Sequence, residues 1–170
     1  MVKVGASRLT LQDFDEIINK GGKVELAAAA LEKVDASHQF LKNFSSQKLI
    51  YGINTGFGPM AQYKVSEDNV LQLQYNLIRS HSSGSGKLMP AHLAKAVMVA
   101  RLSNLIQGFS GVHTELVELL REMINKNVCP CIFEHGGVGA SGDLVQLAHL
   151  GLNLIGEGEV IYEDKVQPTA

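Results

Sequence analysis

The sequence has 170 residues, a length typical of a single domain. It is 45% hydrophobic and 19% charged, as in ordinary globular proteins, and its formal net charge of -2 excludes the basic surplus that marks nucleic-acid or anionic-membrane partners. The apolar stretch at 93–109 is too polar to span a membrane, because it contains Lys95, Arg101 and Asn104. No long apolar segment opens the chain, so we expect a cytoplasmic protein.

Helices dominate the elements that the sequence predicts. Thr10 is placed to cap a first helix at about 11–19, which Gly21 and Gly22 end. Further helices are expected at 27–44, 68–79, 90–107, 114–125 (capped by Thr114) and 143–155, with extended residues at 23–26, a short strand at 49–51 and a hairpin at 160–166. The predicted fold class is mainly α with short β segments.

Three glycine-rich loops separate these helices, at 52–59, 80–86 and 136–142. Loops that a rigid scaffold holds in place commonly carry binding and catalytic groups. The two cysteines, Cys129 and Cys131, are poorly spaced for a mutual disulfide and too few for a structural zinc site. We therefore expect two free thiols and no metal site, and we look for chemistry in the loops.

The third loop formally matches the dinucleotide-binding pattern G-x-G-x-x-G at 137–142. That pattern needs a buried strand before it and a parallel β-α-β unit around it. Residues 129–135 contain a proline and polar residues, and helices precede them, so the nucleotide interpretation is weak. A plain glycine loop with Asp143 at the start of a helix accounts for the glycines and the aspartate, but not for the whole string.

A covalent interpretation accounts for residues 140–142 together. The unhindered amide nitrogen of Gly142 can attack the carbonyl carbon of Ala140 and close a five-membered ring. Loss of two waters, one of them from Ser141, leaves a 4-methylideneimidazole-5-one (MIO) ring, which is an electrophile. The positive end of the helix that follows would favour negative charge on the ring.

Residues 139–144, followed by residues 147–149, resemble the signature of the histidine, phenylalanine and tyrosine ammonia-lyases. Residues 51–58 look like the catalytic tyrosine loop of this family, and residues 73–81 look like its substrate-selectivity segment. Residues 107–112 also resemble the family. One departure is Gln146, where many members carry proline, and it affects the expected geometry of the local helix.

The resemblance covers nearly the whole chain, whereas members of the family are much longer. It implies that residues 1–170 are a single N-terminal region of a longer ammonia-lyase, with the helical fold of the aspartase/fumarase-like superfamily. Members form homotetramers whose active sites are built from several subunits. The implied reaction removes ammonia from an aromatic L-amino acid and gives a trans-2,3-unsaturated acid, with MIO from Ala140, Ser141 and Gly142 and no external cofactor.

The resemblance also assigns roles to individual residues. Tyr51 is the acid/base that removes the β-proton of the substrate, because a tyrosinate held near positive charge or dipoles can serve as a base. The Gly58 loop approaches the substrate, and His81 contacts the substrate ring. Asn54 orients the loop or the substrate amine, and Leu144 completes the substrate-binding set.

The substrate remains open at this point. An imidazole at His81 can hydrogen-bond a phenol or another imidazole, which suits tyrosine and histidine better than phenylalanine. Residues 82–84 and 58–60 favour tyrosine slightly. A 2,3-aminomutase uses the same parts and stays as an alternative. The carboxylate-binding arginine of the family lies later in its chains, so we expect these 170 residues alone to be inactive.

Overall fold

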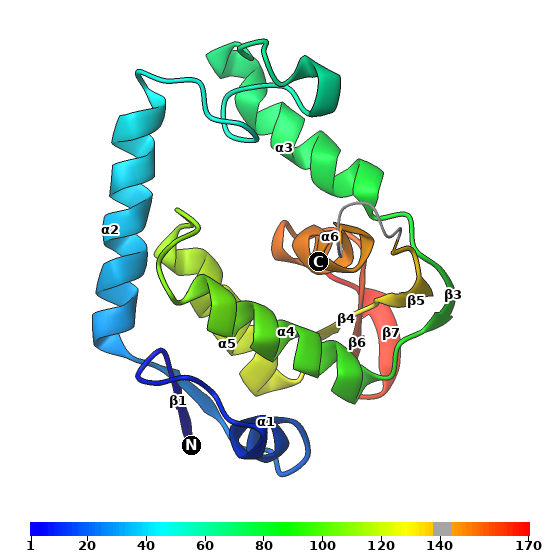
Figure 1. Ribbon diagram of the computed structural model, residues 1–170. Coiled ribbons are helices and arrows are strands. Elements are labelled where there is room, and N and C mark those ends of the chain that lie inside the picture. The colour runs from blue at the N-terminus through cyan, green and yellow to red at the C-terminus, as the bar shows by residue number, and fades with distance from the viewer. Residues whose placement is uncertain (138–143) are drawn as a thin grey trace.

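The computed structural model describes residues 1–137 and 144–170 and confirms a mainly helical chain with short strands (Figure 1). The helices are α1 (Leu11–Ile18), α2 (Ala28–Ser45), η1 (Gly58–Met60, a 3-10 turn), α3 (Glu67–His81), α4 (Ala91–Leu105), α5 (Thr114–Lys126) and α6 (Leu144–Leu154). The strands are β1 (Val2–Val4), β2 (Val24–Leu26), β3 (Ser85–Leu88), β4 (Cys129–Pro130), β5 (Phe133–His135), β6 (Glu159–Tyr162) and β7 (Lys165–Pro168).

The N-terminal strands β1 and β2 pair in parallel on either side of α1. Helix α1 starts at a capping box, in which the Thr10 side chain accepts from the Asp13 amide and the Asp13 carboxylate accepts from the Thr10 amide, as the predicted cap requires. Strand β1 was not predicted from the sequence. It forms because Val2 and Val4 bury their side chains when the strand pairs with β2.

The hydrophobic core centres on α4, which packs against α5, α1 and β4. Three of its side chains, Met98, Val99 and Leu102, are completely buried, as are Val117 and Leu120 of α5. Two antiparallel sheets lie beside these helices, β3–β5 and β4–β6–β7. The last two strands form the hairpin expected from the sequence, and Cys129 and Cys131 are buried free thiols as predicted.

The segment between Val34 and Met89 contributes no residue to this core among the described residues. We call residues 35–88 the arm. It contains most of α2, the first glycine-rich loop and α3, which Figure 1 shows extending away from α4 and α5. No described side chain of α3 is buried. The arm is therefore a scaffold with little internal packing.

Two glycines of the α4–α5 connection hold α2 against the core. A Cβ at Gly108 would lie 2.9 Å from the backbone of Lys33, and one at Gly111 would lie 2.4 Å from the Leu41 side chain. The carbonyl of Gly111 also accepts from Nδ1 of His38, at 2.9 Å. The segment at 107–112 that resembles the family is thus the surface on which α2 packs.

Three predicted boundaries are wrong. Of the short strand or extended segment expected at 49–51, the strand does not form: residues 49 and 50 lead into a turn that begins at Tyr51, and the Ile50 amide donates to the Asn54 side chain. Helix α3 continues to His81, since the amide and hydroxyl of Ser82 both donate to the Ile78 carbonyl at its end. Helix α5 is capped by extended His113 and not by Thr114.

Candidate functional site

The loop that carries Tyr51 is built around the side chain of Asn54, which is 8% exposed. Its Oδ1 accepts from the Ile50 amide at 2.8 Å, and its Nδ2 donates to the carbonyls of Ser45 and Lys48 at 2.9 and 2.7 Å. Both N–H donors of the amide are thereby used. Of the two roles considered for Asn54, these bonds favour orienting the loop over contacting a substrate amine.

Tyr51 lies on the surface of this loop, with 63% of its area exposed. Its phenolic oxygen accepts from the Gly58 amide at 3.3 Å, and the edge of its ring meets Phe57, with ring centroids 6.0 Å apart. Gly58 adopts a left-handed backbone with φ of 53°, which glycine enters at little cost. The structure thus brings together the two loop residues that the sequence singles out.

Helix α3 connects this loop to His81. The side chain of Gln74 donates to the carbonyl of Gly52 at 3.1 Å, so the loop is attached to the middle of the helix. His81 follows seven residues later, about 10 Å along the helix axis. The role of Gln74 was missed from the sequence, although the residue lies inside the recognised segment at 73–81, because a loop contact across 22 residues leaves no local signal.

His81 is the last residue of α3 and is half-buried. Its Nδ1 lies 2.9 Å from the carbonyl oxygen of Leu77. Because a carbonyl only accepts, Nδ1 carries the proton and Nε2 is left as an acceptor. The residue can therefore receive a hydrogen bond from an N–H or O–H donor on a ligand ring.

The tripeptide predicted to form the electrophile, Ala140, Ser141 and Gly142, lies outside the described residues, as does Asp143. The flanking residues meet: a Cβ on Gly136 would lie 2.4 Å from Cγ1 of Val145. Leu144 starts α6 with 48% of its area exposed. Gln146 does not interrupt α6, and within the described part of the chain its buried Oε1 has no hydrogen-bond partner.

Comparison with known proteins identifies the family. The model of the aromatic amino acid lyases matches residues 9–170, which include all the motifs described above. The chain belongs to the aromatic amino acid lyase family. It is 46% identical over 160 residues to a probable histidine ammonia-lyase of Thermoplasma volcanium, covering 94% of this chain and 32% of that relative.

Solved structures of aromatic amino acid lyases and aminomutases share the fold. The tyrosine aminomutase of Streptomyces globisporus superposes with a TM-score of 0.90 at 33% identity, covering 99% of this chain and 32% of that one. The histidine ammonia-lyase of Trypanosoma cruzi gives 0.86 at 29% identity, with coverage of 98% and 32%. The chain thus spans about a third of the length of the relatives it matches.

The alternative of a dinucleotide site conflicts with the sheet topology of this lyase-family chain. Strand β5, which precedes the 137–142 loop, has three residues and pairs antiparallel with β3. Within the described ranges, no parallel strand and crossover helix surround the loop. The β-α-β support that a pyrophosphate-binding loop needs is therefore missing there.

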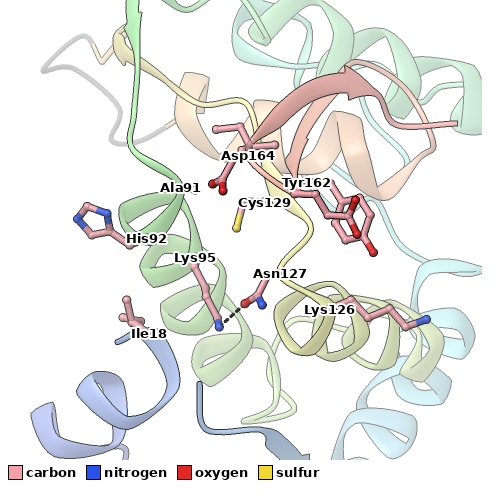
Figure 2. A pocket seen from close by; sticks show the side chains of 11 residues that line it. Ile18, Ala91, His92, Lys95, Lys126, Asn127, Cys129, Tyr162 and Asp164 are labelled. Carbon is pink, nitrogen blue, oxygen red and sulfur yellow. Dashed lines mark hydrogen bonds between the residues drawn. The ribbon is translucent and has the colours of Figure 1, made fainter. Parts of the chain in front are cut away.

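A cavity of about 490 Å³ lies away from these motifs, between α4, the end of α5 and the β6–β7 turn (Figure 2). Buried Lys95 donates from Nζ to Oδ1 of Asn127 at 2.7 Å, as Figure 2 shows. Burial lowers the pKa of the Lys95 ammonium and raises the pKa of the Cys129 thiol. The lining carries charges of both signs, including Glu163 and Asp164, which gives no preference for an anion.

In the described part of the chain, Tyr51, Gly58 and His81 line none of five hollows of about 160 to 720 Å³. Residues 1–137 and 144–170 contain no group of three histidine, cysteine or acidic side chains placed to bind a metal ion. No helix in these described ranges is long and apolar enough to cross a lipid bilayer.

Proposed function

We propose that this chain is the N-terminal third of an enzyme that eliminates ammonia from L-histidine to give urocanate. The observation that carries the proposal is the family match across residues 9–170. The residue types at 51, 58, 81 and 140–142 are those that the chemistry requires. The sequence alone favoured tyrosine slightly. Histidine has more support from the relatives, because the chain is 46% identical to a probable histidine ammonia-lyase, 43% identical to a histidine ammonia-lyase of Legionella pneumophila and 33% identical to a tyrosine aminomutase.

In this proposal Tyr51 removes the β-proton of the substrate. The Gly58 amide, which already contacts the phenolic oxygen, keeps that oxygen in one position. His81 offers unprotonated Nε2 to the N–H of the substrate imidazole, and its proton on Nδ1 stays bound to the Leu77 carbonyl. Leu144 supplies apolar contact beside the tripeptide, and Asn54 acts by fixing the loop.

The residues around the tripeptide fit an internal ring. Gly136 and Val145, which flank it in the sequence, are in contact, so both ends of the segment that contains the tripeptide are held together. Once formed, the MIO ring would supply the electrophile that makes the substrate reactive. Ser141 has the hydroxyl that ring formation must lose, and Gly142 has the unhindered nitrogen.

The mass of the intact chain tests ring formation. We expect a species lighter than the sequence by two waters, and we expect Ser141→Ala to lose one water at most, because it has no hydroxyl for the second loss. An unshifted mass for the unsubstituted protein would overturn ring closure in this chain. We further propose that the chain alone produces neither urocanate nor coumarate, since it spans about a third of its relatives. Either product would overturn that statement.

A second candidate is a 2,3-aminomutase. It is favoured by the TM-score of 0.90 to a tyrosine aminomutase over 99% of this chain. The two reactions differ in their products, because a mutase returns the amino group to the neighbouring carbon and yields a β-amino acid. Product analysis of the full-length protein with L-histidine and L-tyrosine separates them. A β-amino acid as the main product would replace the lyase proposal with the mutase.

A further inference from the structure

The imidazole of His149 on α6 is a buried titratable group that the proposed reaction does not use. Its side chain is buried, and Nε2 accepts a hydrogen bond from the amide of Gly84 at 3.1 Å. A nitrogen that accepts from an amide carries no proton, so the ring is neutral with its proton on Nδ1. The Phe133 ring packs beside it, with centroids 5.3 Å apart.

Gly84 lies three residues after His81, and its contact with His149 is close. A Cβ at position 84 would lie 2.8 Å from Nε2 of His149 and 3.0 Å from Cβ of Phe133. On its other side, Gly84 approaches Gly136, where a Cβ would lie 3.4 Å from the Gly84 Cα. The loop after α3, the residues leading into the tripeptide and α6 therefore converge at Gly84.

Two other contacts of α3 do not reach Gly84. Ile78 packs over Gly151 of α6, and Arg79 forms a two-bonded ion pair with Glu157, which follows α6. On either side of Gly84, Ser82 is bonded back to the Ile78 carbonyl of α3, and Ser85 pairs with His135 of β5. In the described part of the chain, the hydrogen bond from Gly84 to His149 is the one that attaches the backbone at Gly84 to α6.

We propose that His149 is a positioning residue, which holds residues 82–84, and with them His81, at a fixed place relative to the helix that follows the tripeptide. The importance of that placement rests on the proposed function, in which His81 binds the substrate ring. The hydrogen bond between Gly84 and His149 does not depend on the proposed function. A histidine that is merely packed would make no such link, and its loss would change the stability of the whole molecule rather than the position of one loop.

Nuclear magnetic resonance of the 170-residue chain tests the proposal. In the unsubstituted protein, the ¹⁵N shifts of His149 should show an unprotonated Nε2, and an Nε2–H tautomer would overturn the proposal. In His149→Leu, we expect the Gly84 amide to exchange with solvent roughly tenfold faster and the His81 ring resonances to move, while α4 and α5 amides keep their rates. His149→Gln keeps an acceptor and should restore slow exchange.

His92→Gln is the matched control, because His92 is an exposed histidine on α4. Unchanged Gly84 exchange in His149→Leu, or acceleration that the core amides share equally, would overturn the positioning role. If His149→Leu does not fold, the tautomer and the His149→Gln rates still decide the question. The masses of the same samples report ring closure separately, so an unshifted mass with an intact hydrogen bond would overturn ring closure in this chain and leave the positioning role standing.

Discussion

The core and the arm of this molecule are built in opposite ways. Around α4 and α5, side chains such as Leu102 and Leu120 have no exposed area, and the helices are held by apolar packing. The arm carries Tyr51, Gly58 and His81, yet it buries almost nothing and is held by hydrogen bonds and glycine contacts. Groups that meet a ligand cannot also be packed in a core, so it is consistent that these three proposed site residues lie where little apolar surface is buried.

The largest expected effect separates the two regions by stability. Leu102→Ala should lower the free energy of unfolding by about 2–5 kcal/mol, because it leaves a cavity in the core. Leu71→Ala, in the arm at 66% exposure, should change it by less than about 0.5 kcal/mol. Urea unfolding followed by circular dichroism measures both. Equal losses would mean that the arm is packed in solution, contrary to its exposure.

The packing of α2 against the core gives the next largest change in stability. Gly111→Ala places a side chain at φ of 64° and within 2.4 Å of Leu41, whereas Gly21→Ala meets a similar φ of 71° with nothing within 4 Å. Strained backbone should cost each variant about 1 kcal/mol, and the clash should cost Gly111→Ala about 1–3 kcal/mol more. Thermal unfolding of the pair checks this. Identical melting temperatures would show that α2 can shift away without loss.

The loop that carries Tyr51 should respond to substitution locally. Asn54→Ala removes three hydrogen bonds to the backbone and should cost about 1–3 kcal/mol, concentrated in residues 45–54. Hydrogen exchange read by mass spectrometry should show faster exchange there and unchanged exchange in α4. Asn69→Ala, which loses one exposed bond to Ser66, is the control. If the two variants behave alike, Asn54 does not hold the loop.

The smallest expected effect is a change of the free energy of unfolding with pH. Burial lowers the pKa of His149 below its ordinary 6.5, so the unfolded chain binds a proton more readily than the folded one. Its contribution to stability is complete above 6.5 and is lost as the pH falls from 6.5 through the lower folded value. Cys131 and Glu159 line the small cavity of about 160 Å³ beside it. Urea unfolding between about pH 7 and pH 5 should therefore show a slope that His149→Gln weakens.

Much of this could be predicted from the sequence, because the signals are local. The helical periodicity, the Thr10 cap and the C-terminal hairpin each depend on residues within one or two turns, and all three are present. The candidate site residues could also be picked out from the sequence, because each motif is a continuous segment of the chain. The boundaries failed at 49–51 and 80–86, where the Asn54 side chain and Ser82 decide how the backbone bonds.

By itself, the sequence determined the fold class and the family, and it supplied the residues that we propose for the site. Only the tertiary structure decided how those residues are held: Gln74 under the Tyr51 loop, His149 behind the His81 loop and Gly111 against α2. The physical reason is distance along the chain. Those three contacts join residues 22, 65 and 70 positions apart, and no local pattern records which remote backbone group a side chain will meet.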